Sequence, residues 1–106
     1  MKVKGRVIVV TGGGNGIGRA CVDRFSAEGA KIVVADLLPG PGQAAVDAVT
    51  ADGGEAIFVE LDVASPEANH RMAAAAVEAF GTIDVVVTAA GISSADYVSG
   101  DIEGQV

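Results

Sequence analysis

Apolar residues gather in four short runs that alternate with longer, alanine-rich stretches. The runs are rich in β-branched residues and cover Val7–Val10, Lys31–Ala35, Ala56–Leu61 and Ile83–Thr88. Within each run the apolar residues are nearly continuous instead of alternating with polar ones, which is typical of parallel strands buried on both faces. The pattern therefore predicts four strands whose two faces are both covered.

The three stretches between the runs have the spacing of helices, because apolar residues recur there at intervals of three and four. We expect helices at Gly16–Glu28, at Pro41–Ala51 and in a third stretch that starts at Ser65 and is closed by Gly81. Ser65 is a capping hydroxyl, and the proline after it suits the first turn of a helix. The positions expected to face the sheet are Ile17, Ala20, Cys21 and Phe25, then Ala45, Val46 and Val49, and then Ala73, Ala76, Val77 and Phe80.

Strands and helices thus alternate with connections of a few residues. This order predicts an α/β fold with right-handed crossovers and a doubly wound parallel sheet that is truncated after about four strands. We expect one domain over residues 1–106, well patterned over 1–91 and weakly patterned over 92–106. The run Ile83–Thr88 is expected to form an apolar edge of the sheet, which favours association.

Composition narrows the possible partners. The chain of 106 residues is 50% hydrophobic and carries a net charge of −7, so nucleic acid and anionic membrane surfaces are not expected as partners. No apolar stretch approaches the ~20 residues of a membrane-spanning helix. One cysteine, Cys21, cannot form an intrachain disulfide, which suits the cytoplasm. One cysteine and one histidine, His70, cannot build a zinc site, so no metal is expected.

A glycine-rich segment, Thr11–Gly18, directly follows the first run and opens the first predicted helix. Backbone N–H groups at a helix start favour phosphate anions, and glycine permits their close approach. The spacing is Thr-Gly-x-x-x-Gly-x-Gly, through Gly12, Gly16 and Gly18, and the Gly-x-Gly-x-x-Gly fingerprint does not fit. We interpret the segment as a pyrophosphate-binding turn; the alternative is a tight turn that binds nothing.

This turn resembles that of the short-chain dehydrogenase/reductase family, in its compact, single-domain branch. The resemblance covers essentially the whole chain but only about the first half of the family's usual length, and it implies a Rossmann-type fold that binds NAD(P). In the turn it points to Gly12, Asn15, Gly16, Ile17 and Gly18 as residues that bind the cofactor.

The resemblance also assigns roles after the second run. Asp36 is expected to accept both hydroxyls of the adenosine ribose and to repel a 2′-phosphate. Asn15 and Leu37 occupy positions where members that prefer NADP often carry Arg or Lys. The cofactor expected from this combination is NAD in preference to NADP. The alternative for Asp36 is an ordinary solvated acid at the end of a strand.

Two later segments match the family in order. Asp62 and Val63 correspond to the pair beside the adenine ring, with a loop acid on the approach to Ser65 as the alternative for Asp62. Thr88, Ala90 and Gly91 lie in the segment that takes the place of the family's Asn-Asn-Ala-Gly, and they are expected to contact the cofactor. Only the last two residues of that motif are retained, which weakens the correspondence at positions 88 and 89. Thr88 offers a shorter hydroxyl there, and backbone contacts remain available.

The family's catalytic serine, tyrosine and lysine have no counterparts in this stretch. The family motif places Lys four residues after its tyrosine, but here Asp101 follows Tyr97 at that distance. Ser93 and Ser94 come too early to be the catalytic serine. We therefore expect no catalytic residue, and no activity from these 106 residues alone.

The resemblance implies hydride transfer between a nicotinamide and a small alcohol or carbonyl substrate, with this chain as the cofactor-binding part of the enzyme. It also implies a homo-oligomer. Two alternatives remain open. One is a non-catalytic module that binds NAD or associates with itself through the fourth run, and the other is a defective truncation with no function.

Overall fold

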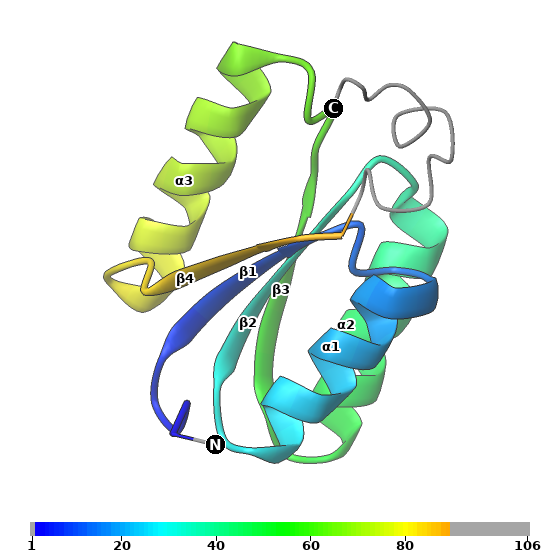
Figure 1. The fold of residues 1–106 in the computed structure, drawn as a ribbon, viewed down its shortest axis with the longest axis vertical. Helices are drawn as coiled ribbons and strands as arrows, with labels where there is room; N and C mark the ends of the chain where they lie inside the picture. Colours follow the sequence, from blue (N-terminus) through cyan, green and yellow to red (C-terminus); the bar gives the residue numbers. More distant parts are fainter. Residues whose placement is uncertain (1, 90–106) are drawn as a thin grey trace, which may run out of the picture.

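Figure 1 shows a computed structural model of the chain, which describes residues 2–89. Within that range four strands and three helices follow one another in the predicted order. Their bounds are β1 Val7–Thr11, α1 Gly16–Ala27, β2 Lys31–Asp36, α2 Pro39–Ala51, β3 Glu55–Glu60, α3 Pro66–Phe80 and β4 Val85–Thr88.

The strands form one parallel sheet in the order β3-β2-β1-β4. The chain adds β2 and β3 on one side of β1 and then returns to place β4 on the other side. Helices α1 and α2 cover one face of the sheet, and α3 covers the opposite face (Figure 1). The predicted doubly wound, Rossmann-type architecture is confirmed. In such sheets ligands bind outside the carboxyl ends of the strands, where the strand order reverses, which here is between β1 and β4.

Each face of the sheet has its own apolar core. Along β1, Ile8 and Val10 point toward α1 and α2, whereas Val7 and Val9 point toward α3. The core under α1 and α2 consists of Ile8, Val10, Val22, Ala30, Ile32, Val34, Ala45, Val46 and Val49. The core under α3 consists of Val7, Val9, Val33, Ala35, Leu61, Ala68, Met72 and Ala76. The two central strands are thus buried on both sides, as the sequence predicts.

Burial falls from the central strands to the outer ones. The apolar residues of β3 pack alternately against the two cores but are only half-buried, and the prediction that both faces are covered is wrong for β4. No residue of β3 or β4 is fully buried, whereas every residue of β1 is. Val85 is 42% exposed and Val86 is 52% exposed. Both outer strands lie at the edges of the described sheet, and α3 packs over β1, β2 and β3. β4 is therefore the exposed apolar edge that the sequence predicts.

Two helices follow the predicted stripes only in part. In α1, Cys21 and Phe25 pack against the core as predicted, but Ile17 and Ala20 are exposed and the buried positions are Gly18 and Val22. In α3, Ala76 is buried and Phe80 packs against the core as predicted, but Val77 is 50% exposed and the other buried positions are Ala68 and Met72. In α2 the predicted Ala45, Val46 and Val49 are all buried. Periodicity locates an apolar stripe, but the glycine turn and the crossing of each helix over the sheet decide which side of the stripe is covered.

The register of the strands brings the carboxyl ends of all four strands to the same side of the sheet. Thr11 of β1 pairs with Ala35 of β2 and with Thr88 of β4, and Asp36 pairs with Glu60 of β3. We call the side of the sheet where these strands end the carboxyl edge, and the opposite side the amino edge. In the described part of the chain no helix has the length and apolar character needed to cross a membrane.

Candidate cofactor site

A pocket of about 600 Å³ lies at the carboxyl edge, and we call it the carboxyl-edge pocket. It is formed by the segments that follow β1, β2, β3 and β4, which are far apart in the sequence. The residues that line it are Gly12, Asn15, Gly16, Ile17, Gly18, Ala35, Asp36, Leu37, Leu38, Leu61, Asp62, Val63 and Ala89. Nine of these are residues that the sequence predicts to bind a cofactor.

Hydrogen bonds connect the glycine turn to β2 and to β4. The N–H of Gly12 donates to the Ala35 carbonyl oxygen at 2.6 Å, and the buried Thr11 hydroxyl donates to the Val87 carbonyl oxygen at 3.4 Å. Gly12 has φ +73° and Gly16 has φ +55°, a region that residues with a Cβ atom rarely adopt. The turn thus needs glycine at these two positions for its backbone conformation.

Gly18 is needed for a different reason. A Cβ atom at this position would collide with the carbonyl oxygen of Gly12. The absence of a side chain lets the first turn of α1 lie directly against the glycine turn. The N–H groups at the start of α1 are thereby brought to the floor of the pocket.

The start of α1 is open to an acceptor from outside the helix. Asn15 is the N-cap residue, but its side chain makes no capping hydrogen bond, and the first turn carries no acidic residue. In contrast, the first turn of α3 is satisfied by the chain itself, because the Ser65 hydroxyl accepts from the Ala68 N–H at 3.1 Å. Free N–H groups and the positive end of the helix dipole attract anions. The start of α1 is therefore suited to a phosphate group.

Asp36 ends β2 as predicted and stands beside the glycine turn. Its Oδ2 atom accepts from the Gly14 N–H at 2.8 Å, and its Oδ1 atom accepts from the Leu38 N–H at 3.0 Å. The backbone N–H of Leu61 also donates to the Asp36 carbonyl oxygen at 2.9 Å. Both carboxylate oxygens of Asp36 therefore accept backbone hydrogen bonds, and the side chain remains partly exposed.

Asp62 lies in the loop after β3 and lines the pocket. Its Oδ1 atom accepts from the Ala64 N–H at 3.0 Å, and its backbone oxygen accepts from the Ser65 N–H at 2.9 Å. Asp62 therefore stabilises the loop that leads into α3, which agrees with its interpretation as a loop acid. It also lines the pocket, as a contact with the adenine ring would require.

Apolar side chains surround the mouth of the pocket. Ile17 is 61% exposed, Leu37 58%, Leu38 52% and Val63 49%. Exposed aliphatic side chains of this size around a concave site provide surfaces on which a flat ring packs. The pocket thus combines the open start of α1 with exposed apolar side chains.

Thr88 is exposed at the end of β4 and does not line the pocket. Its neighbour Ala89 does, and the Ala89 N–H donates to the Thr11 carbonyl oxygen at 3.1 Å. Ala90 and Gly91, like Ser93, Ser94 and Tyr97, lie outside the described residues. Sequence reasoning missed the lining residues Ala35, Leu38, Leu61 and Ala89; the available signal was that each directly adjoins a predicted site residue or a strand end.

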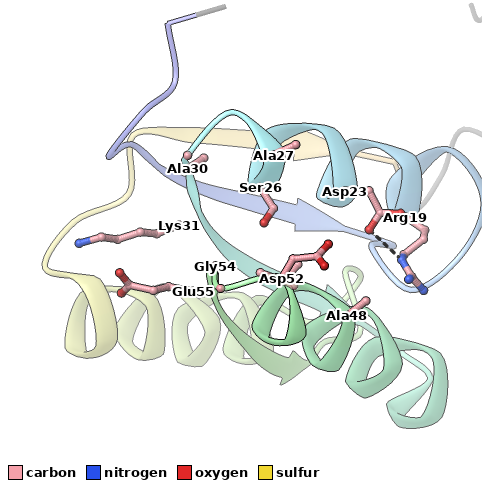
Figure 2. A pocket seen from close by; sticks show the side chains of 13 residues that line it. Arg19, Asp23, Ser26, Ala27, Ala30, Lys31, Ala48, Asp52, Gly54 and Glu55 are labelled. Carbon is pink, nitrogen blue, oxygen red and sulfur yellow. Dashed lines mark hydrogen bonds and ion pairs between the residues drawn. The ribbon is translucent and has the colours of Figure 1, made fainter.

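A second pocket, of about 570 Å³, lies between α1 and α2 near the amino ends of β2 and β3 (Figure 2). We call it the amino-edge pocket. Charged side chains line it: Arg19 and Asp23 form an ion pair of 3.1 Å across its rim, and Asp52 and Glu55 lie beside the end of α2. None of its described lining residues starts a helix, and its two glycines with positive φ, Gly29 and Gly53, follow the ends of α1 and α2.

The chain matches the family model described as short chain dehydrogenase over residues 6–103. It is 41% identical over 91 residues to 2,5-dichloro-2,5-cyclohexadiene-1,4-diol dehydrogenase of Sphingobium indicum, covering 86% of this chain and 36% of that protein. It is 44% identical over 92 residues to cis-1,2-dihydrobenzene-1,2-diol dehydrogenase of Pseudomonas putida, covering 87% of this chain and 32% of that protein.

Among solved structures, the fold is similar to a short chain dehydrogenase/reductase from Burkholderia phymatum in complex with NAD. The TM-score is 0.79 and the identity 37%, over 81% of this chain and 31% of the other. The chain thus spans about a third of the length of the relatives it matches. The matched residues include the glycine turn, all four strands and the three helices between them, so the chain belongs to the short-chain dehydrogenase family.

Proposed function

We propose that the carboxyl-edge pocket binds NAD and that the chain forms the cofactor-binding part of an NAD-dependent oxidoreductase. The observation that carries the proposal is the open start of α1, held against the glycine turn by the absence of a side chain at Gly18. The anion site, the apolar rim and a carboxylate are combined within one pocket of about 600 Å³, which suits a dinucleotide better than a simple anion.

Each part of the pocket has a role toward the cofactor. The N–H groups at the start of α1 bind the pyrophosphate, and Asp36 accepts hydroxyls of the adenosine ribose. Leu37 and Val63 pack against the adenine ring, and Asp62 accepts its amino group. NAD is preferred because a 2′-phosphate would meet the Asp36 carboxylate, with neutral Asn15 and Leu37 beside it.

When bound, the nicotinamide supplies the hydride donor or acceptor for an alcohol or carbonyl substrate. The contribution of the described residues is to bind and orient the cofactor, and no described side chain of this pocket is assigned to proton transfer. The two named relatives are dehydrogenases of cyclic diols, which supports a secondary alcohol as the substrate class. The cytoplasmic location and the homo-oligomer remain predictions.

The test is a calorimetric titration of the 106-residue protein with NAD and with NADP, combined with NMR mapping of the backbone amides. We expect one NAD to bind per chain and NADP to bind about tenfold more weakly. The amide signals of Gly12, Gly16 and Gly18 should shift on binding. Binding of neither nucleotide, or shifts confined to the amino-edge pocket, would contradict the proposal.

A second candidate function is a self-associating module, and the exposed edge strand β4 supports it. Val85 and Val86 are exposed there, and no charged residue or proline lies within the strand to discourage pairing. Analytical ultracentrifugation separates the two candidates: a dimer that persists without binding NAD favours the module, whereas NAD binding by a monomer favours the cofactor-binding part.

A further inference from the structure

Asp36 connects three parts of the chain that form the pocket. Its Oδ2 atom accepts from Gly14 in the glycine turn at 2.8 Å, and its Oδ1 atom accepts from Leu38, the N-cap residue of α2, at 3.0 Å. The two bonds fix the orientation of the carboxylate, because each oxygen has its own backbone donor. The side chain therefore links the turn before α1 to the start of α2.

The turn and α2 also touch directly below this carboxylate. A Cβ atom at Gly14 would lie 2.8 Å from the Pro41 Cβ atom and 2.9 Å from the Gly42 nitrogen. On the far side, a Cβ atom at Gly42 would overlap the Phe58 ring of β3. The turn, α2 and β3 are thus packed closely, with no room for a side chain at either glycine. The Asp36 hydrogen bonds hold the turn in this packed position.

The two backbone bonds leave Asp36 with acceptor capacity. An ionised carboxylate offers about four lone-pair sites, and Gly14 and Leu38 each use one. Two sites remain, which is the number that the two ribose hydroxyls of the proposed ligand need. Holding the turn and accepting the ribose are thus compatible in one side chain.

We propose that Asp36 is a positioning residue for the pyrophosphate, in addition to its proposed contact with the ribose. It holds the glycine turn against α2 so that the N–H groups at the start of α1 stay aligned toward the phosphates. This inference rests on the proposed function and adds to it a role that Asp36 exerts through the turn, at a distance from the ribose.

Charge alone predicts the opposite outcome. Asp36 is negative and stands beside the site proposed for a negative diphosphate, so removing its charge would strengthen diphosphate binding if the carboxylate acted only through repulsion. Loss of the hydrogen bonds from Gly14 and Leu38 would instead weaken the binding of the diphosphate. The sign of the change therefore separates the two effects.

The experiment titrates the 106-residue protein with ADP and with 2′,3′-dideoxyadenosine diphosphate, which lacks both ribose hydroxyls. The variants are Asp36→Ala, which removes the hydrogen bonds from both Gly14 and Leu38, and Asp36→Asn, which retains an oxygen that can accept one of them. Asp52→Ala is the control, because it removes the same charge from an exposed residue at the other end of α2.

We expect Asp36→Ala to bind the dideoxy nucleotide about tenfold more weakly than the unchanged protein, with Asp36→Asn between the two. Asp52→Ala should bind it as the unchanged protein does. Unchanged or tighter binding of the dideoxy nucleotide by Asp36→Ala, with ADP binding weakened, would overturn the inference and leave only the ribose role.

Hydrogen exchange of the Gly14 amide provides a readout that does not depend on a ligand. The amide should exchange at least about tenfold faster in Asp36→Ala, while amides of the central strands β1 and β2 keep their rates. Equal acceleration throughout the sheet would indicate general destabilisation and overturn the positioning role. If the protein without substitutions binds neither nucleotide, the proposed function fails. Separately, if the Gly14 amide exchanges at the same rate in Asp36→Ala, the hydrogen bond from Gly14 to Asp36 does not hold the turn.

Discussion

The carboxyl-edge and amino-edge pockets have nearly the same volume, about 600 and 570 Å³, but opposite chemistry. The first contains a glycine turn, an open helix start and two carboxylates, Asp36 and Asp62, that accept from backbone N–H groups. The second is lined by charged side chains, and both α1 and α2 end beside it, with the acidic residues Glu28 and Asp52 at their C-cap positions. Volume alone therefore does not identify the functional site.

The difference follows from the direction of the strands. In a parallel sheet every helix begins at the carboxyl edge and ends at the amino edge, so the positive ends of the helix dipoles gather at one edge and the negative ends at the other. In the amino-edge pocket Arg19 is paired with Asp23, and the Lys31 Nζ atom lies 5.9 Å from the centre of the Phe80 ring. Asp52 and Glu55 add negative charge there, but the carboxyl-edge pocket is itself lined by two carboxylates and, among the described residues, by no cation. The direction of the helices, and not the count of charged side chains, therefore distinguishes the two pockets.

The largest effect is expected from Gly18→Ala, because the new Cβ atom would displace the Gly12 carbonyl and separate the turn from α1. We expect NAD binding to fall at least about a hundredfold, with a loss of about 1–3 kcal/mol of unfolding free energy. Titration calorimetry and urea unfolding measure the two quantities.

Gly40→Ala is the matched control, because its Cβ atom would meet nothing within 4 Å on the surface of α2. It should leave NAD binding unchanged. Gly16→Ala is a milder variant, which strains the positive φ without a collision. A folded Gly18→Ala protein with normal NAD affinity would show that the turn is not the anion site.

A smaller effect is expected from Leu37→Arg, which places a cation beside Asp36 at the rim of the carboxyl-edge pocket. NADP binding should strengthen about tenfold through a charge-assisted contact with the 2′-phosphate, while NAD binding changes little. Ala27→Arg adds the same charge at the amino-edge pocket, and the ratio of the NADP and NAD dissociation constants should not respond to it. An equal gain in NADP affinity in both variants would mean that the effect comes from the net charge of the protein and not from the position of the cation.

The smallest effect is expected from Ser65→Ala, which opens the start of α3 at the same edge as α1. Loss of the hydroxyl bond to the Ala68 N–H should lower the free energy of unfolding by about 1 kcal/mol. NAD affinity and stoichiometry should stay the same, because α3 has no glycine turn to bring a ligand close. A second bound nucleotide in this variant would mean that an open helix start is sufficient at this edge.

Much of the fold could be predicted because it is encoded locally. The glycine turn, the capping residue Ser65 and the position of Asp36 at the end of β2 all appear in the structure where the sequence places them. The helix faces were harder. The predicted Ile17 is exposed at the pocket while Gly18 beneath it is buried, because the close contact with Gly12 outweighs the size of the side chain.

The sequence by itself determined the order of strands and helices, the glycine turn and the resemblance to the family, because each depends on residues close together along the chain. The tertiary structure alone decided that Asp36 bonds to Gly14 and Leu38, that Leu38, Leu61 and Ala89 complete the pocket, and that β3 is only half-buried. These features depend on which strands become neighbours and in what register. Hydrophobic periodicity specifies that a face is to be buried, but not which distant segment will cover it.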